Sequence, residues 1–267
     1  MRGRVLIIAG SDSGGGAGIQ ADIKTVTMLD AYAATAITAL TAQNTEGVFG
    51  VWPVPPDFIR RQIEVVLEDI GADTIKTGML HDPLVIETVA AAIGERAAAV
   101  PLVVDPVMVA KGGARLIDPD AIDGLKRLLI SRADVVTPNL PEAEVLSGKA
   151  IGDVAAMRAA GERLLALGCR AVLVKGGHLS GETVTDMLVT ADGTRVWESP
   201  RIETRHTHGT GCTLASAIAA GLAQGLDVEG AADRARAYVH RAIAGAPGLG
   251  HGHGPLDHAH PLRAAHG

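Results

Sequence analysis

The sequence predicts an α/β fold in which helices cover both faces of a mostly parallel sheet. Apolar runs of strand length alternate with helical patterns along the 267 residues, which is the order expected for such a sheet. Hydrophobic residues make up 47% of the chain and aromatic residues only 2%. The core must therefore consist of Ala, Val, Ile and Leu, as in strands buried on both faces. No linker interrupts the chain, so residues 1–267 are expected to form one domain.

The expected strands are short apolar runs: Val5–Ala9, Thr74–Thr77, Leu102–Val104, Val135–Thr137 and Ala171–Val174. The expected helices are Gly18–Leu29, Pro56–Asp69, Pro83–Glu95, Pro119–Ile130, Val154–Leu167, Gly211–Gly225 and a final amphipathic helix at Asp227–Ala244. Asp-Pro pairs mark two of the helix starts, and glycines mark two of the ends. Val184–Val189 and Arg195–Glu198, joined across Asp192-Gly193, predict a hairpin at one edge of the sheet.

The composition excludes several classes of protein. A formal net charge of −6 argues against a general nucleic-acid binder, and no run approaches the ~20 apolar residues of a membrane span. The apolar run near the N-terminus is shorter than that of a signal peptide and reads as the first strand. Two cysteines, Cys169 and Cys212, are too few for a disulfide framework. We therefore expect a cytoplasmic protein whose partners are small molecules.

Four polar clusters directly follow expected strands. They are Gly10–Gly18, Asp105-Pro106, Thr137–Glu142 and Lys175–His178. In an open parallel sheet the ligand crevice lies beyond the carboxyl ends of the strands, so these clusters are expected to meet at one edge.

The first cluster, Gly10–Gly18, does not match a common nucleotide-binding loop. Its glycines do not fit the G-x-G-x-x-G spacing, and it lacks the Gly-Lys-Ser/Thr of a Walker A loop. The segment is either a flexible turn or a surface on which backbone atoms contact a flat substrate. In the second case Asp22, on the helix that follows, is available as a hydrogen-bond acceptor.

The segment His208–Thr213 places a glycine-rich turn and a thiol at the start of an expected helix. A helix N-terminus leaves about four backbone N–H groups unpaired and carries about half a positive charge, so it suits a phosphate. Cys212 is then a reactive group inside an anion site. The alternative is an ordinary glycine-rich connection in which Cys212 is a small buried hydrophobe.

Residues that follow three of the strands suit a nucleotide and a metal ion. Carboxylates such as Asp105 and Glu142 can hold Mg²⁺ while the metal bridges phosphates, and Asn139 can orient either one. Lys175 precedes two glycines, so its ammonium can reach a transferring phosphate. The alternatives are helix caps or solvated acids for the carboxylates, and a surface lysine with a packed stem for Lys175.

Gln43 follows the apolar segment Ala36–Thr41. Its carboxamide offers a donor and an acceptor side by side, which matches the ring nitrogen and amino edge of an aminopyrimidine. An ordinary turn amide is the alternative.

Five of the ten histidines lie in the tail, residues 251–267. Their spacing fits no tight metal site, and glycine and proline interrupt it. We therefore expect a structural or disordered tail.

Taken together, these motifs resemble those of the hydroxymethylpyrimidine/phosphomethylpyrimidine kinases of thiamine biosynthesis, a branch of the ribokinase-like superfamily. The motifs that carry the resemblance are Ile8–Asp22, Thr41–Thr45, Lys76–Leu80, Asp105–Met108, Thr137–Ala143, Lys175–His178, Thr207–Thr213 and Gly254–His258. The resemblance implies a ribokinase-like three-layer α/β/α sandwich that uses ATP and Mg²⁺ and forms a homodimer. It also implies two successive phosphorylations, of 4-amino-5-hydroxymethyl-2-methylpyrimidine and then of its monophosphate.

The resemblance further implies roles for residues on the substrate side. Gln43 would read the pyrimidine edge, while Asp22, Met79 and Gly10 would line the pocket around the ring. The loop Ser11–Gly16 lacks the proline often found there in this family, so its detailed shape is open.

On the nucleotide side, Lys175 would contact ATP phosphates with Asn139 and Thr210 nearby. Asp105 and Glu142 would support Mg²⁺.

Gly209, Gly211 and Cys212 would form an anion hole that acts with Lys175 in catalysis, and Ala110–Ile117 would be a mobile flap that excludes water. Related sugar and pyridoxal kinases commonly carry Asp at the Cys212 position, where it acts as general base. A helix N-terminus and nearby cations can lower the pKa of a thiol enough to give a thiolate at neutral pH, although ATP phosphates oppose that shift. Cys212 is then either a base, chiefly for the first transfer, or a positioning group.

Three other functions are open. A pyridoxal kinase of the same fold, or an enzyme with both activities, is the nearest. A non-catalytic pyrimidine-binding or regulatory protein is disfavoured by the presence of Lys175, Asp105, Glu142 and Cys212 together. A cysteine hydrolase built on Cys212 would need a Cys–His pair, and His208 is near it only in sequence.

Overall fold

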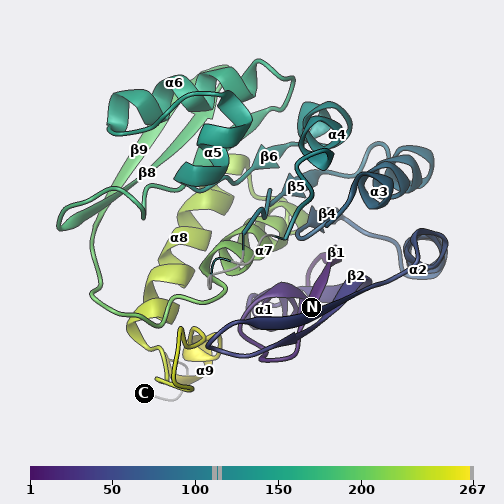
Figure 1. Ribbon diagram of the computed structural model, residues 1–267, viewed down its shortest axis with the longest axis horizontal. Helices are drawn as coiled ribbons and strands as arrows, with labels where there is room; N and C mark the ends of the chain where they lie inside the picture. The colour runs from purple at the N-terminus through teal and green to yellow at the C-terminus, as the bar shows by residue number, and fades with distance from the viewer. Residues whose placement is uncertain (110–112, 114–115, 265–267) are drawn as a thin grey trace.

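The computed structural model describes residues 1–109, 113 and 116–264. In chain order the strands of these residues are β1 (Arg4–Asp12), β2 (Tyr32–Gln43), β3 (Val48–Pro53), β4 (Thr74–Thr77), β5 (Leu102–Val104), β6 (Val135–Val136), β7 (Ala171–Val174), β8 (Thr183–Thr190) and β9 (Gly193–Pro200). They form one sheet in the order β3-β2-β1-β4-β5-β6-β7-β8-β9 (Figure 1). The strands from β2 to β7 in this order run parallel, while β3 runs antiparallel to β2, β8 to β7, and β9 to β8.

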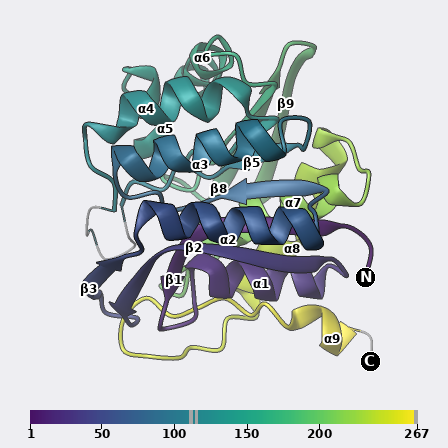
Figure 2. The ribbon, with the colours of Figure 1, turned by 90° about the vertical axis from the view of Figure 1, so that its right-hand side faces the viewer.

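Helices cover both faces of the sheet (Figure 2). One face carries α1 (Gly18–Met28), α7 (Thr210–Ala223) and α8 (Val228–Ala244). The other carries α2 (Pro56–Asp69), α3 (Pro83–Arg96), α4 (Ala121–Leu128), α5 (Leu140–Ser147) and α6 (Val154–Leu165). A 3-10 turn, η1 (Ile130–Arg132), follows α4, and α9 (His260–Ala264) ends the described chain. The three-layer α/β/α fold expected from the sequence is confirmed.

The first strand shows why its apolar run is continuous rather than alternating. Leu6 and Ile8 belong to the core layer that also contains residues of α2 and α3. Val5, Ile7 and Ala9 point to the opposite side and belong to the layer with α1 and α7. Because both faces of the strand are covered, each position must be apolar.

Five elements are not among those expected from the sequence: β2, β3, α5, the 3-10 turn η1 and α9. In β2 the alternation of small apolar residues with threonine is a weak period-two signal. In β3 all residues but the first are exposed, so pairing with β2 rather than burial makes it a strand. The expected strands and the edge hairpin are present, while the helix expected from Pro119 begins at Ala121.

The histidine-rich tail packs against the turn before α7. Pro255 pairs with His208 in an isolated bridge, and the Tyr238 hydroxyl donates a hydrogen bond of 2.7 Å to the His258 carbonyl. Leu256 and His258 are buried. As far as Ala264 the tail is therefore structural, and no cluster of three potential metal-ligating side chains occurs within the described residues.

Candidate active site

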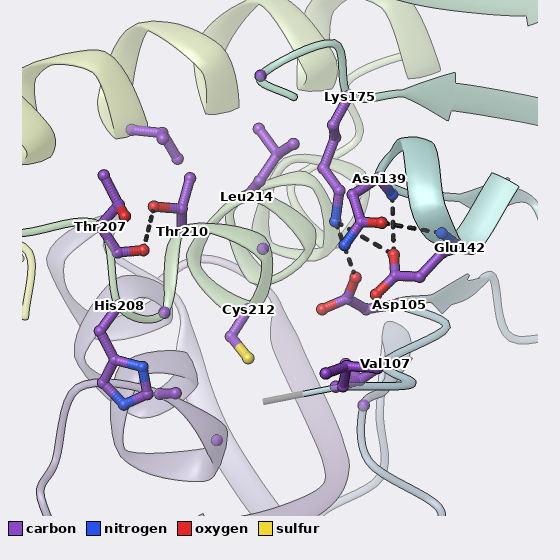
Figure 3. Close-up of a pocket in the computed structure, with 18 of the residues that line it drawn as sticks. Asp105, Val107, Asn139, Glu142, Lys175, Thr207, His208, Thr210, Cys212 and Leu214 are labelled. Carbon is purple, nitrogen blue, oxygen red and sulfur yellow. Dashed lines mark hydrogen bonds and ion pairs between the residues drawn. The ribbon is translucent and has the colours of Figure 1, made fainter. Parts of the chain in front are cut away.

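A cavity of about 700 Å³ lies beyond the carboxyl ends of the parallel strands (Figure 3). It brings together residues of β1, β2, β4 and α7 and residues that follow β5, β6 and β7, which are far apart in the sequence. The candidate residues from the sequence that line it are Gly10, Gln43, Met79, Asp105, Asn139, Glu142, Lys175, Gly209, Thr210, Gly211 and Cys212. The rule that ligands bind beyond the carboxyl ends of parallel strands, here called the strand-end rule, therefore predicted the position of this cavity.

The anion site at the start of α7 depends on a close backbone approach. Gly209 has φ of 82°, and a Cβ atom there would stand 1.8 Å from the Gly16 carbonyl oxygen. Only glycine fits this position without moving the loop. The Thr210 hydroxyl donates to the Thr207 carbonyl at 2.8 Å, and no side chain caps the helix start. The start of the helix is thus not capped by a side chain, and Gly209–Cys212 line the cavity, so backbone N–H groups of this turn can bind an anion there.

Cys212 lies in this first turn, but its thiol does not match the expected thiolate. Its pKa is raised to about 12, chiefly by burial and to a smaller extent by the charges of Asp22 and Asp105. The Lys76 ammonium lowers the pKa by more than Asp22 raises it, yet it does not offset burial. The expectation of a lowered pKa is therefore wrong for the protein alone, because enclosure outweighs the helix N-terminus.

Lys175 and two carboxylates form the other wall of the cavity. The Lys175 Nζ lies 3.2 Å from Asp105 Oδ1 and 4.0 Å from Glu142 Oε2. Burial alone would lower the pKa of Lys175, but both carboxylates outweigh burial and raise it, so the ammonium stays charged. Burial raises the pKa of Glu142 to about 7, with Asp105 adding to the rise and Lys175 opposing it.

The same carboxylates fit part of a Mg²⁺ site. Asp105 Oδ1 accepts from Thr137 and Lys175, whereas its buried Oδ2 has no hydrogen-bond partner among the described residues. Mg²⁺ in nucleotide enzymes is typically held by one or two carboxylates, with phosphate and water as the remaining ligands. The donor set therefore suits a magnesium ion that arrives with a nucleotide.

Asn139 and Glu142 also act as a helix cap, as the alternative reading of the sequence allowed. The Glu142 N–H donates to Asn139 Oδ1 at 2.9 Å, and the Asn139 N–H donates to Glu142 Oε2 at 2.8 Å. This capping box starts α5 and holds the Glu142 carboxylate near Lys175. The capping and ligand-binding roles are thus compatible in one residue.

The opposite end of the cavity is formed by Gly10, Gln43 and Met79. A Cβ atom at Gly10 would lie 3.2 Å from the Met79 methyl group, so glycine leaves room for this side chain at the cavity wall. The Thr38 hydroxyl donates to the Met79 carbonyl at 2.7 Å and fixes the backbone there. This end combines the apolar Met79 side chain with the Gln43 carboxamide and suits a flat ring that carries polar groups on one edge.

Asp22 does not line the cavity. Its side chain is fully buried behind it, where Oδ2 accepts from Lys76 at 2.9 Å and Oδ1 accepts from Ser216 at 2.7 Å. Its predicted place in the pocket is therefore wrong, because the helix α1 turns this carboxylate toward β4 and α7. Lys76, which the sequence analysis gave no role, lines the cavity instead.

Asp12 and His208 are two further residues that line the cavity without a predicted role. His208 Nε2 lies 2.8 Å from Asp12 Oδ2 and 3.3 Å from the Gln43 amide nitrogen. The imidazole is thus directed to the substrate end, which removes support for a hydrolase pair with Cys212. One available signal was the position of Asp12 within the polar cluster that follows the expected first strand.

Five residues of the flap predicted at Ala110–Ile117, namely 110–112 and 114–115, lie outside the described part of the chain. It stays a prediction.

No helix in the described ranges combines the length and apolar character needed to cross a membrane.

Comparison with known proteins identifies the family. The family model described as phosphomethylpyrimidine kinase matches residues 12–257. The chain is 53% identical over 257 residues to the thiamine biosynthesis bifunctional protein ThiED of Geobacter sulfurreducens, covering 96% of this chain but 52% of that longer protein. It is 46% identical to the hydroxymethylpyrimidine/phosphomethylpyrimidine kinase of Bacillus subtilis, covering 96% of this chain and 94% of that protein.

Among solved structures, an ADP complex of Bacillus subtilis pyridoxal kinase superposes with a TM-score of 0.90 at 38% identity, covering 98% of this chain and 99% of that one. The family model spans most of the chain, and the match to the Bacillus subtilis kinase extends over nearly the full length of both proteins. The chain belongs to the phosphomethylpyrimidine kinase family.

Proposed function

We propose that the chain, acting as one kinase domain, transfers the γ-phosphoryl group of ATP to the hydroxymethyl group of 4-amino-5-hydroxymethyl-2-methylpyrimidine, and then adds a second phosphoryl group to the monophosphate. The observation that carries this proposal is the position of Cys212 between two chemically different ends of one cavity. The end with Lys175 suits phosphates and a metal ion, and the end with Gln43 suits an aminopyrimidine. The names of the relatives support this substrate.

In this proposal Lys175 binds phosphate oxygens of ATP, with Asn139 and Thr210 on the same side. Asp105 and Glu142 hold Mg²⁺, which would neutralise charge on the phosphates when bound. The N–H groups at the start of α7 receive the charge of the transferred group.

Cys212 positions the attacking hydroxyl group rather than removing its proton. Its thiol is protonated at neutral pH, since burial raises its pKa to about 12. Phosphoryl transfer depends mainly on alignment and charge neutralisation, and a loose transition state lets the hydroxyl proton leave late. As the new O–P bond forms, the bond from phosphorus to the bridging oxygen breaks and ADP leaves with that electron pair. The proton passes to solvent.

A coupled assay of ADP release, with phosphorus NMR to identify both products, tests this function. We expect turnover that requires Mg²⁺ and yields the monophosphate before the diphosphate. A Lys175→Met variant serves as the inactive control. Absence of pyrimidine-dependent ADP release from the folded wild-type protein would contradict the proposal.

Pyridoxal phosphorylation is a second candidate activity. It is favoured by one observation, the close superposition on a pyridoxal kinase over nearly the whole chain. The same assay with pyridoxal decides between one activity and two. A kcat/KM for pyridoxal that exceeds the value for the aminopyrimidine would reverse the order of the two functions.

We propose further that two copies of the chain associate through β3. Both phenylalanines of the chain and one of its two tryptophans are exposed on or beside this edge strand: Phe49 at 72%, Phe58 at 58% and Trp52 at 73%. An exposed apolar edge strand is a pairing surface. Association with a second copy covers the β3 edges of both copies at once. Light scattering after gel filtration should give a dimer that Trp52→Glu converts to a monomer. The matched control Leu262→Glu, at an exposed site on α9, should remain dimeric. A monomeric wild type would refute this.

A cytoplasmic location is proposed as well. Cys169 and Cys212 are both free, which supports a reducing compartment. Cell fractionation with an antibody against the chain checks it.

A further inference from the structure

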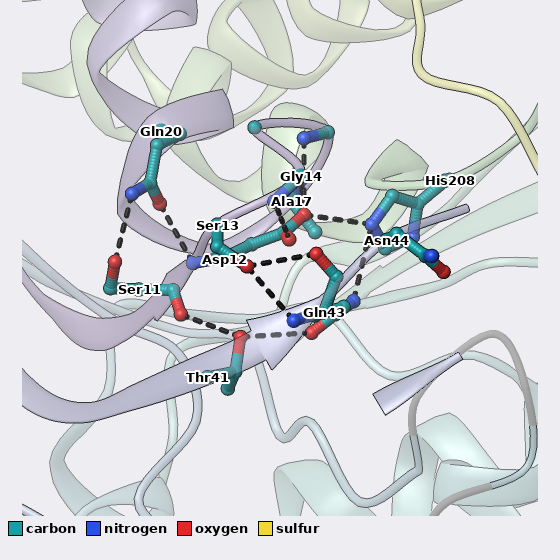
Figure 4. A network of polar contacts seen from close by, with 12 residues as sticks. Ser11, Asp12, Ser13, Gly14, Ala17, Gln20, Thr41, Gln43, Asn44 and His208 are labelled. Atoms are coloured by element: carbon teal, nitrogen blue, oxygen red, sulfur yellow. Dashed lines mark hydrogen bonds and ion pairs between the residues drawn. The ribbon is translucent and has the colours of Figure 1, made fainter. Parts of the chain in front are cut away.

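The Gln43 carboxamide lies between two polar side chains at the substrate end of the cavity (Figure 4). Its Oε1 is 3.3 Å from Thr41 Oγ1, and its Nε2 is 3.3 Å from His208 Nε2. The same His208 nitrogen is 2.8 Å from Asp12 Oδ2. All four side chains belong to residues that line the cavity. Their hydrogen atoms determine which way the amide can face.

Asp12 fixes the proton on His208. The Asp12 carboxylate accepts hydrogen bonds from the N–H groups of Gly14, Gly16 and Ala17 at 2.8, 3.0 and 2.8 Å. Burial alone would raise the pKa of Asp12, but its bonds to His208 and to the loop outweigh burial and lower it. The ionised carboxylate only accepts, so the His208 nitrogen at 2.8 Å must carry a hydrogen, whether the ring is neutral or charged.

The Thr41 hydroxyl group determines which atom of the amide can face it. Its hydroxyl group has one hydrogen, which it donates to the Ser11 carbonyl at 2.9 Å. A carbonyl has no hydrogen to give, so the direction of this bond is fixed. Toward Gln43 the hydroxyl oxygen can therefore only accept.

The contacts with His208 and with Thr41 favour the same orientation of the Gln43 amide. With its nitrogen toward His208, the amide sets N–H against N–H and turns its oxygen to a hydroxyl whose hydrogen is already used. A half-turn of the amide exchanges its two atoms without changing its shape. The NH₂ group can then donate to Thr41, and the carbonyl oxygen becomes a second, more distant acceptor of the one His208 N–H, which it shares with Asp12. We infer that Gln43 donates from its NH₂ group to Thr41 and accepts with its carbonyl oxygen from His208, and that His208, held by Asp12, is the positioning residue that fixes this orientation.

The orientation determines how a substrate lies, and this step rests on the proposed function. An aminopyrimidine presents a ring nitrogen that accepts beside an amino group that donates. The remaining N–H of Gln43, on the Thr41 side, pairs with the ring nitrogen, and the carbonyl, on the His208 side, pairs with the amino group. The hydroxymethyl carbon is attached next to the amino-bearing carbon, so it also lies on the His208 side. That side leads to the start of α7 and Cys212, where the phosphoryl group is transferred (Figure 3).

Substrate discrimination tests the inference better than activity alone. The 4-oxo analogue of the substrate presents the reverse edge, with a ring N–H donor beside a carbonyl acceptor. We expect the wild type to prefer the amino compound by about 100-fold or more in kcat/KM, since a site built for one hydrogen-bond pattern rejects its reverse. His208→Leu should reduce this preference at least tenfold, mainly through KM, because Gln43 can then turn. His208→Gln is the matched control, since it keeps an N–H group near the position of Nε2 and should retain the preference within threefold.

A purely structural role of His208 would lower kcat/KM for both compounds equally, and an unchanged ratio in His208→Leu would overturn the inference. The Asp12 carboxylate keeps its three backbone donors in that variant, so folding is expected to survive. Should it fail, Thr41→Val removes the other constraint on the amide and should lower the preference in the same way.

Nitrogen NMR of the imidazole provides a readout that needs no turnover. The ring signals of His208, assigned by their loss in His208→Gln, should show a protonated Nε2 across the neutral pH range. An unprotonated Nε2 would overturn the inference even if both phosphorylations occur. Failure of the proposed function is distinguishable, because it leaves the wild type without pyrimidine turnover while the NMR result stands.

Discussion

Replacing Lys76 by methionine should destabilise the protein strongly. The Lys76 and Asp22 side chains are both 0% exposed, and their charged atoms are 2.9 Å apart. Methionine preserves most of the length and volume, so the variant removes the charge without leaving a large cavity. Asp22 then keeps only the hydrogen bond from Ser216. Removing one partner of a buried ion pair costs about 3–5 kcal/mol, because the remaining charge is left uncompensated or must be neutralised.

The double variant Lys76→Met/Asp22→Asn should recover most of this loss. Asparagine can still accept from Ser216, and no unpaired charge remains, so we expect a stability within about 2 kcal/mol of the wild type. Urea unfolding measures both variants, with an unchanged slope as the check on two-state behaviour. Arg4→Met, which breaks the exposed pair of Arg4 with Asp73, is the control and should barely move the midpoint. A single variant as stable as the wild type, or a double variant no more stable than the single, would refute the reasoning.

Three further predictions concern the anion site and the metal site. Gly209→Ala should reduce kcat by about 100-fold or more, because displacing the Gly16 carbonyl moves the helix start that binds the phosphoryl group. The control is Gly225→Ala, which has a similar positive φ but open space around it and should leave kcat unchanged. Glu142 has a pKa near 7, so it is protonated below that pH and cannot serve as a metal ligand; the affinity for Mg²⁺·ATP, measured by calorimetry, should rise as pH increases through about 7, and Glu142→Gln should remove this rise. Cys212→Ala should slow both phosphorylations by similar factors in single-turnover experiments if the thiol only positions, whereas a loss confined to the first transfer would restore the role of general base.

The strand-end rule predicted most of the site because it depends only on strand boundaries. Asp105 and Lys175 each follow a strand that is visible in the sequence, so their convergence required no knowledge of side-chain packing, whereas the place of Gln43 in the site was implied by the family resemblance. The sheet could be predicted for the same reason, except for β2 and β3. β2 shows only a weak alternation of small apolar residues with threonine, and the residues of β3 are mostly exposed and carry no burial pattern.

Asp22 and His208 could not be placed from the sequence because their partners are remote. Asp22 contacts residues 54 and 194 positions away, and His208 contacts one 196 positions away. Periodicity shows that Asp22 lies on a helix but not which strand or helix its carboxylate meets. Lys76 was a signal that could have been used, since a lysine within a short apolar strand requires a buried partner.

The pairing of Asp12 with His208 also determines when, during synthesis of the chain, the substrate end of the cavity can form. The two residues are separated by 196 positions, and the tail that pairs with His208 through Pro255 follows still later. At about 5–20 residues per second, the loop after β1 waits about 10–40 seconds on the ribosome before its partner is made. During this time β1 and β2 can pair, and the N–H groups of the loop Gly14–Ala17 can bind Asp12. The Asp12 carboxylate still lacks its hydrogen-bond partner His208. The substrate end of the cavity is therefore among the last parts of the molecule to form, and a chain released before Pro255 would carry the nucleotide end without a finished ring site.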